Sequence, residues 1–313
     1  MTHAASPYSQ LDDLIALRFH VKPRRLVPQQ KLISEKGGYH QAVRKGRGMD
    51  FSEVREYTAG DDVRHIDWKV SARTQKTHTK VFTEELEKPV VCVLEQSPAL
   101  FFGSRTRFKS DLALQLATLL GWVTFQQGDR FGGLVFNHLG HQWVEPRHQQ
   151  ASIMQFVHQG LALQQQLKSP KTGSTQFTAD ATAPSLWLPM LNRLQQHLKP
   201  GTRVFLIGDF IDCGDALVAK CAQLKRHADL SLIHVYDPLE AQLPALGSLR
   251  LSDGEQEMAL NSLDEAFRQR YADHYDQAWQ TLHQQLAPWH LPLVAISTDE
   301  DPLQAMVAQG ILR

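Results

Sequence analysis

One pattern limits the possible folds of this 313-residue chain more than any other. From Lys88 onward, short β-branched segments alternate with longer segments of helical spacing, as buried strands and helices do. The expected strands are 89–95, 130–136, 203–210, 230–236 and 291–297, and the expected helices are 108–127, 149–167, 186–198, 215–227 and 263–286. Parallel strands need long crossovers, which place helices on both faces of a sheet. The pattern therefore predicts an α/β fold with a doubly wound, mostly parallel sheet.

The first part of the chain lacks this alternation. Residues 9–21 place apolar side chains near one helical face behind a capping-box spacing, so a short helix is expected there. We expect a smaller N-terminal segment at 1–87 and a sheet domain at 88–313. Within the sheet domain, an Asp-Gly turn at 253–254 predicts a β-hairpin insertion at about 238–262.

The charge balance argues against a polyanion-binding protein, because 33 Lys and Arg face 33 Asp and Glu. The charges are nevertheless uneven, since residues 22–48 carry eight basic side chains against Glu35 alone. This basic segment keeps nucleic-acid binding open as an alternative function. Six carboxylates follow between Asp50 and Asp67, and Tyr39 is the only aromatic residue available for stacking, so nucleic acid is not the favoured partner.

Cysteine usage and hydropathy point to a cytoplasmic protein. The three cysteines form no CxxC pair, which favours a reducing compartment. Asp12 and Asp13 stand where a secretory signal needs an apolar core. The most apolar stretch, 112–125, is interrupted by polar residues and is shorter than the ~20 residues of a membrane span. We therefore expect no membrane association.

Carboxylates follow three of the expected strands. Glu95, Asp209 and Asp237 each stand at or just after the carboxyl end of a strand. Ligands of open parallel sheets bind beyond these ends, next to the point where the strand order reverses. These residues therefore mark the edge of the sheet where a binding site is expected.

The first strand end, Glu95-Gln-Ser97-Pro-Ala99, resembles the metal-ion-dependent adhesion motif (MIDAS) of von Willebrand factor A domains. That motif reads DxSxS, so Glu95 replaces its Asp and Ala99 its second Ser. The resemblance implies that Thr175 is the loop threonine and Asp209 the distal aspartate. Magnesium needs near-octahedral oxygen ligands at about 2.0–2.1 Å. We therefore expect no resident cofactor and at most weak Mg²⁺ binding at this degenerate motif.

A second group of functional residues is expected between positions 55 and 73. Guanidinium and carboxylate groups alternate there and could form bidentate pairs that hold irregular backbone in place. The residues singled out are Arg55, Tyr57, Asp61, Arg64, Asp67, Trp68 and Arg73. They are either a structural network or a docking surface for a protein partner.

Several of these motifs together resemble one bacterial family, domain-of-unknown-function family fifty-eight. They are Gly46-Arg-Gly48, the GDDVRHIDW segment, Lys80 to Glu84, the strand ends at Ser97 and Asp209, and Asp237 to Glu240 with Leu243-Pro244. The resemblance covers about residues 40–300. It implies a von Willebrand factor A-like fold and a cytosolic accessory protein that acts with a MoxR-type AAA+ ATPase in complex maturation or chaperone-like work.

Catalysis is the third class considered. The chain has no GxSxG elbow, HExxH or phosphate-binding GxxxxGK[ST] motif. His138, His141 and His148 lie on or near a hairpin expected from the segments 130–136 and 142–146, where histidines are usually exposed polar residues. A hydrolase that uses the strand-end carboxylates remains the alternative. We favour a non-enzymatic protein-protein interaction adaptor.

Overall fold

A computed structural model describes residues 8–27, 49–58, 61–84, 88–167, 186–211, 213–252 and 257–313. The chain forms two compact units. One contains Met1–Ser34 and Lys88–Arg313, and the other contains Glu35–Glu87.

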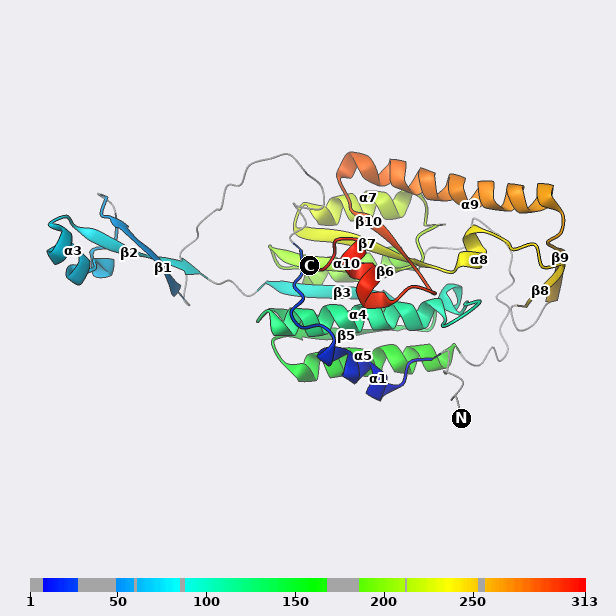
Figure 1. The fold of residues 1–313 in the computed structure, drawn as a ribbon, viewed down its shortest axis with the longest axis horizontal. Coiled ribbons are helices and arrows are strands. Elements are labelled where there is room, and N and C mark those ends of the chain that lie inside the picture. Colours follow the sequence, from blue (N-terminus) through cyan, green and yellow to red (C-terminus); the bar gives the residue numbers. More distant parts are fainter. Residues whose placement is uncertain are drawn as a thin grey trace. The chain divides into compact units, whose positions relative to one another are not determined.

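The larger unit contains a six-stranded sheet with the order β10-β7-β6-β3-β4-β5 (Figure 1). Its strands are β3 Pro89–Glu95, β4 Arg130–Phe136, β5 His141–Arg147, β6 Thr202–Gly208, β7 Ala228–Tyr236 and β10 Leu293–Ser297. All neighbouring strands are parallel except β5, which pairs antiparallel with β4 at the edge. The mostly parallel sheet expected from the sequence is confirmed.

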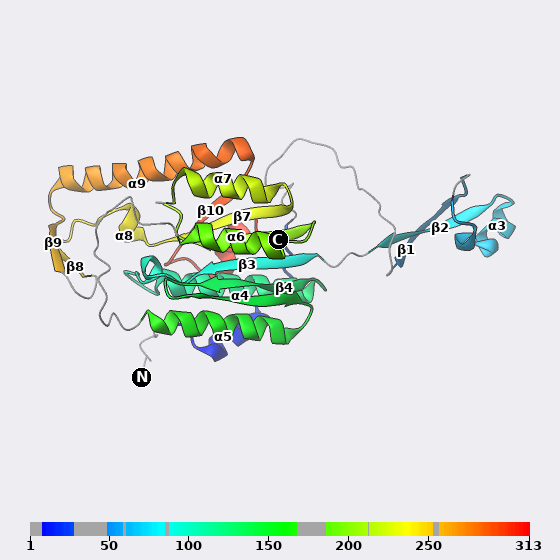
Figure 2. The same cartoon turned by 180° about the vertical axis from the view of Figure 1, so that it is seen from behind.

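Helices cover both faces of the sheet (Figures 1 and 2). They are α1 Leu11–Ala16, α4 Lys109–Gln126, α5 Gln150–Gln166, α6 Trp187–His197, α7 Gly214–Lys225, α8 Pro238–Ala241, α9 Glu265–Leu286 and α10 Pro302–Ala308. Because strand side chains alternate between faces, Val90, Cys92 and Leu94 of β3 pack with α4 and α5. Val91 and Val93 pack on the other face with α6, α7 and α9. The central strand is therefore buried on both sides, as its apolar sequence predicts.

The N-terminal segment was expected to be one part from 1 to 87, but its first described residues belong to the sheet unit. Leu14 is 1% exposed, and its carbonyl oxygen accepts a hydrogen bond of 3.2 Å from Trp122 Nε1. Leu26 pairs with Leu312 in an isolated bridge. The apolar face of α1 is buried against α4 and α5, which explains why this short helix lies there.

The capping box expected at Ser9 does not form. Gln10 is the N-cap residue of α1, and it makes no side-chain capping hydrogen bond. Ser9 instead donates from its amide and its hydroxyl to Asp111 Oδ1, near the start of α4. Burial raises the pKa of Asp111, and these two donors act in the opposite direction. The serine that the spacing assigned to a local helix cap therefore makes a long-range contact with α4.

The smaller unit is built on an antiparallel pair of strands, β1 Met49–Glu56 and β2 His78–Glu84. The 3₁₀ turn η2 Val63–His65 and the helix α3 Trp68–Thr74 lie between them in the chain. Sequence reasoning did not predict these strands, because both are rich in charged residues and lack an alternating apolar pattern.

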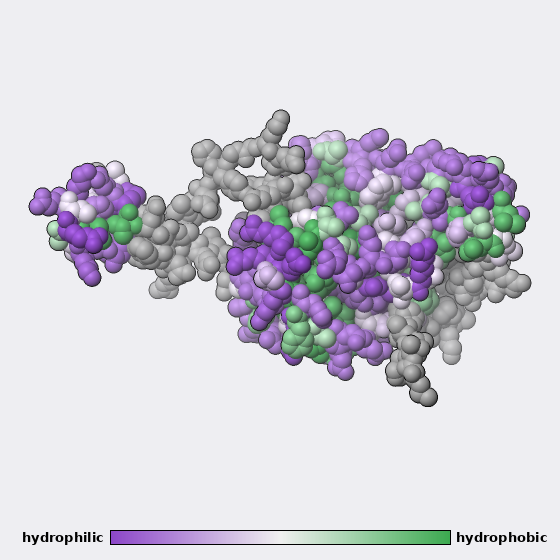
Figure 3. Space-filling view, in the orientation of Figure 1, coloured by the Kyte–Doolittle hydropathy of each residue, from purple (hydrophilic) through white to green (hydrophobic). Residues whose placement is uncertain are grey.

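Two further strands follow α8 and form a hairpin, β8 Ser248–Ser252 with β9 Glu257–Asn261. The long helix α9 then returns along the sheet with a mostly hydrophilic outer side (Figure 3). Within the parts of the chain that the structure describes, no helix is long and apolar enough to span a membrane.

Candidate functional site

The candidate site lies at the carboxyl ends of β3 and β6. These strands are neighbours in the sheet although they are not consecutive in the chain, so they flank the point where the strand order reverses. Glu95 is the last residue of β3, Asp209 directly follows β6, and Asp237 directly follows β7. The structure therefore brings the three expected carboxylates to one edge, at the place where ligands of open α/β sheets bind.

Glu95 is buried, and both of its carboxylate oxygens are hydrogen-bonded by protein groups. Oε1 accepts from Ser97 Oγ at 2.7 Å. Oε2 accepts from Trp187 Nε1 at 3.2 Å and from the amide of Asp209 at 3.0 Å. Burial raises the pKa of Glu95 to about 7. This carboxyl group therefore links β3 to α6 and β6 and changes its charge near neutral pH.

Lys109 supplies a cation that the sequence analysis did not identify. It is the first residue of α4 and is fully buried, and its Nζ lies 2.8 Å from Asp209 Oδ2 and 2.6 Å from Glu240 Oε1. Burial lowers the pKa of Lys109, but the charges of the two carboxylates outweigh burial and raise it overall. Burial alone would raise the pKa of Asp209. The nearby charge of Lys109 outweighs burial, so the pKa of Asp209 lies below its ordinary value.

Asp237 organises the loops around this cation. Its carboxylate accepts four hydrogen bonds, from the amide and hydroxyl of Ser104, the hydroxyl of Thr298 and the amide of Leu239. It also forms a capping box with Glu240, whose Oε2 accepts from the Asp237 amide at 2.9 Å. The other oxygen of Glu240 accepts from Lys109. The cap at Asp237 therefore fixes the start of the short helix α8, which places the Glu240 carboxylate against the Lys109 ammonium.

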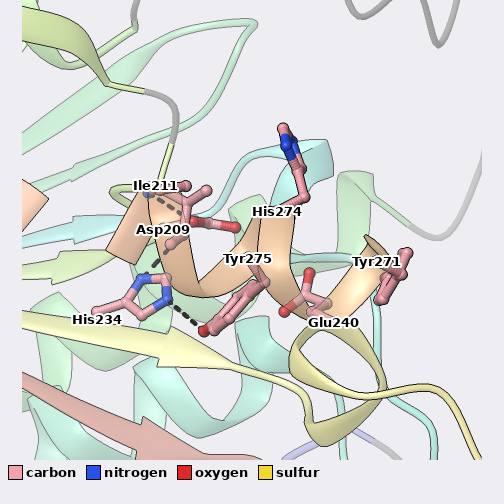
Figure 4. A pocket seen from close by; sticks show the side chains of 8 residues that line it. Asp209, Ile211, His234, Glu240, Tyr271, His274 and Tyr275 are labelled. Atoms are coloured by element: carbon pink, nitrogen blue, oxygen red, sulfur yellow. Dashed lines mark hydrogen bonds and ion pairs between the residues drawn. The ribbon is translucent and has the colours of Figure 1, made fainter. Parts of the chain in front are cut away.

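A pocket of about 200 Å³ opens beside the cluster (Figure 4). It is lined by Asp209, Ile211, His234, Glu240, Tyr271, His274, Tyr275 and Ala278. The tyrosines and His274 come from α9, which forms one wall (Figure 4). The side chain of Lys109 is 1% exposed, whereas those of Asp209 and Glu240 are 21% and 27% exposed. The exposed part of the charged cluster thus belongs to the two acidic side chains and not to the lysine.

His234 of β7 is neutral and links the neighbouring elements beside the pocket. Its Nδ1 accepts from the amide of Phe210 at 3.3 Å, which leaves the ring proton on Nε2, 3.4 Å from the hydroxyl of Tyr275. Burial lowers the pKa of His234 to about 4. Because the ring is 1% exposed and already engaged on both nitrogens, it holds β7 against β6 and α9 and is poorly placed as a general base.

The expected MIDAS set is only partly assembled. Glu95, Ser97 and Asp209 lie at one edge of the sheet, while Thr175 lies outside the described residues. The Ser97 hydroxyl donates a hydrogen bond to Glu95, and Asp209 accepts one from Lys109. Among the described residues, no three His, Cys, Asp or Glu side chains are arranged to hold a metal ion. With Ser97 hydrogen-bonded to Glu95 and Asp209 paired with Lys109, these residues offer few free oxygens to a magnesium ion.

The expected Arg/Asp network is much smaller than its sequence suggests. Within the described part of the chain, one ion pair joins two of the seven residues, Arg55 to Asp61 at 2.7 Å, and Asp67 pairs with Lys80, outside the set, at 3.7 Å. The Thr58 amide and Arg55 lower the pKa of Asp61. Asp67 also caps α3 through the amides of Lys69 and Val70. It therefore accepts backbone donors where a guanidinium was expected.

Among the described residues, the other four members of the set form no further ion pairs with one another. The Tyr57 amide pairs with Thr77 next to the strands, and the Arg64 amide donates to the carboxylate of Asp62. Arg73 is exposed in the last turn of α3, and the Trp68 side chain at the start of this helix is 71% exposed. The closely spaced carboxylates of this segment therefore mostly accept hydrogen bonds from nearby backbone amides, in turns and at the start of a helix.

The site residues that were missed had recognisable but weak signals. Lys109 is the one cation in an otherwise mostly apolar helix, and a cation at a helix N-terminus is electrostatically unfavourable. Such a residue needs nearby carboxylates. Glu240 stands three positions after Asp237, the spacing of a capping box. Nothing in either signal says that the two side chains meet, because 131 positions separate them.

A tight contact at Gly208 makes the geometry of Glu95 testable. A Cβ at this position would lie 2.3 Å from Glu95 Oε2 and 2.6 Å from Trp187 Cζ2. We expect Gly208→Ala to lower the free energy of unfolding by about 2 kcal/mol, since overpacked cores must displace their side chains. Gly140→Ala is the matched control, because nothing lies within 4 Å of its Cβ. Equal denaturation midpoints for the two variants would contradict this packing.

Comparisons with known proteins place the chain among uncharacterized relatives. A family model described as "Protein of unknown function DUF58" matches residues 53–280. Uncharacterized proteins of Mycobacterium bovis and Mycobacterium tuberculosis are each 27% identical over 283 residues, which are 90% of this chain and 85% of the relative. The crystal structure of the conserved hypothetical protein BatB from Bacteroides thetaiotaomicron matches with a TM-score of 0.40 and 15% identity, covering 71% of this chain and 95% of that chain.

Proposed function

Because the chain belongs to the DUF58 family of proteins of unknown function, we propose that it is a non-enzymatic adaptor of the bacterial cytoplasm. In this proposal it docks on a MoxR-type AAA+ ATPase and assists complex maturation or chaperone-like work. The partner follows from the resemblance of the motifs described above. The proposed docking surface for the ATPase is on the smaller unit, and the proposed role of the sheet unit is to hold a client protein.

The observation that carries the proposal is the exposed apolar surface of the smaller unit. Trp68 at the start of α3 is 71% exposed and Val63 of η2 is 62% exposed. Large aromatic side chains of this kind dominate the binding energy of many protein interfaces. The Arg55–Asp61 ion pair holds the turn that precedes η2, with Thr58 bonded to both. The exposed residues are therefore presented on a defined turn and helix.

The chemistry of the strand edge supports binding more than catalysis. Glu95, Asp209, Asp237 and Glu240 each accept hydrogen bonds from other protein groups. His234 is buried and neutral because its pKa is lowered to about 4. A general base needs a free acceptor within reach of its substrate. These groups are better suited to holding loops in place than to moving protons.

We expect Trp68→Ala to weaken capture of the MoxR-type ATPase at least tenfold, since an aromatic hot spot contributes about 2 kcal/mol or more. The measurement is binding of the purified ATPase to the immobilised full chain. Leu139→Ala is the matched control, because Leu139 is 69% exposed in the turn between β4 and β5 of the sheet unit. Both variants should keep the wild-type thermal midpoint, since neither side chain is buried.

Two results would count against this proposal. One is a wild-type chain that neither binds the purified ATPase nor recovers it from its host. The other is equal loss of binding in Trp68→Ala and Leu139→Ala, which would remove the smaller unit as the docking surface.

A further inference from the structure

Residues Glu95 and Asp209 flank the place where a von Willebrand factor A domain would hold a divalent metal. That place requires about six oxygen ligands with free lone pairs at about 2.0–2.1 Å. Here the oxygens of Glu95 already accept three hydrogen bonds, and Ser97 uses its proton to make one of them. Ala99 offers no side-chain oxygen. Among the described residues, a metal at this place would therefore compete with these hydrogen bonds for the same oxygens.

Lys109 supplies positive charge at the same edge. Its Nζ is held at 2.8 Å by Asp209 and at 2.6 Å by Glu240, distances typical of a charge-assisted hydrogen bond. The three groups come from α4, from the end of β6 and from α8, so the ammonium links three separate elements. A resident metal links the loops that ligate it in the same manner.

We propose that the ammonium group of Lys109 is the built-in cation of this site and takes the place of a divalent metal. The site is therefore complete without metal. For a metal to bind Asp209, it must displace a cation that is 1% exposed and already paired with two carboxylates. Such displacement is strongly unfavourable, because it leaves a buried ammonium without its counter-charge. The proposal concerns the sheet unit alone and does not depend on the ATPase partner.

The first experiment needs no variant. The full wild-type chain is titrated with MnCl₂ and with MgCl₂, and its thermal midpoint is measured in EDTA and in 5 mM MgCl₂ at matched ionic strength. We expect no saturable binding below about 1 mM and no shift in midpoint, since a ligand stabilises only through affinity for the folded state. Stoichiometric micromolar binding that Asp209→Asn abolishes would overturn the proposal.

The second experiment removes the cation. Lys109→Ala leaves Asp209 and Glu240 facing a vacated space, so we expect Mn²⁺ to bind this variant at least tenfold more tightly than the wild type. Mn²⁺ and methylammonium chloride should both raise its thermal midpoint, whereas tetramethylammonium chloride, which lacks N–H donors, should not. The double variant Lys109→Ala with Asp209→Asn should lose both responses. A folded Lys109→Ala that responds to neither cation would refute the proposal.

A third comparison decides the matter if Lys109→Ala does not fold. Lys109→Arg keeps a cation at the position, and Lys109→Gln keeps a polar side chain without charge. The proposal expects Lys109→Arg to fold in EDTA and Lys109→Gln to be less stable. A stable Lys109→Gln together with a misfolded Lys109→Arg would show that the site needs the shape of lysine and not its charge.

Discussion

Replacing Lys109 with methionine is expected to lower the free energy of unfolding by about 3 kcal/mol. Removing one partner of a buried ion pair typically costs about 3–5 kcal/mol, because it leaves an uncompensated charge. We expect the lower end of this range, since the side chains of Asp209 and Glu240 are 21% and 27% exposed and keep some contact with water. The measurement is urea denaturation followed by tryptophan fluorescence.

Two control variants separate the loss of charge from the loss of packing. Lys199→Met changes an exposed lysine before β6 and should shift the free energy of unfolding by less than about 0.5 kcal/mol. The triple variant Lys109→Met, Asp209→Asn and Glu240→Gln should recover most of the loss, because neutral groups of similar volume often replace buried charges without cost. If Lys109→Met and Lys199→Met unfold at the same urea concentration, the buried ion pairs contribute nothing measurable.

The second large effect is a pH-dependent gain in stability for Glu95→Gln. The folded pKa of Glu95 is raised from 4.5 to about 7 by burial. A raised pKa means that the folded state binds the proton more tightly than the unfolded state, so its contribution is complete below about pH 4.5. That contribution is lost as the pH rises through about 7. The full difference corresponds to about 3 kcal/mol.

Glutamine keeps an acceptor for Trp187 and the Asp209 amide but cannot ionise. We therefore expect Glu95→Gln to be as stable as the wild type near pH 4.5 and more stable by up to about 3 kcal/mol at pH 8. The check is the difference between the free energies of unfolding at pH 5, 6, 7 and 8. A difference that stays constant over this range would mean that Glu95 is ionised in the folded state throughout.

His234 titrates in the opposite sense but does not enter this difference. Burial lowers its pKa to about 4, below the ordinary value near 6.5. The unfolded state then binds the proton more tightly, so stability is lost as the pH falls from about 6.5 to 4. Both proteins contain His234, and the subtraction removes its contribution. The two pH ranges overlap between about 4.5 and 6.5, where the opposing effects roughly cancel, so the wild type should be most stable in that range.

The regular elements of the sheet unit were predictable because their signals are local. Strand β3 is apolar at nearly every position and is buried on both faces. Helix α4 is apolar on all sides, and its buried residues run along its length. Strands with this composition need helices on both faces, so the fold class followed from short-range periodicity. The strands β1 and β2 lack that periodicity, and their pairing was missed.

The candidate site was predictable only in its location. Strand-end carboxylates had to meet at one edge, because parallel strands bring their carboxyl ends together. The partners of those carboxylates were not predictable, because Lys109 meets Asp209 across 100 positions and Glu240 across 131. The same holds for Ser9, whose spacing suggested a local cap but whose partner is Asp111.

The sequence by itself determined that the chain contains a doubly wound sheet and that carboxylates stand at the carboxyl ends of three of its strands. Periodicity and strand ends are properties of neighbouring residues, so they can be read without coordinates. Only the tertiary structure decided what fills the edge where these strands end. It turned Ser97 toward Glu95 and placed the Lys109 ammonium between two carboxylates. A buried cation is stable only where distant elements bring its counter-charges within hydrogen-bonding distance, and that depends on packing and not on local spacing.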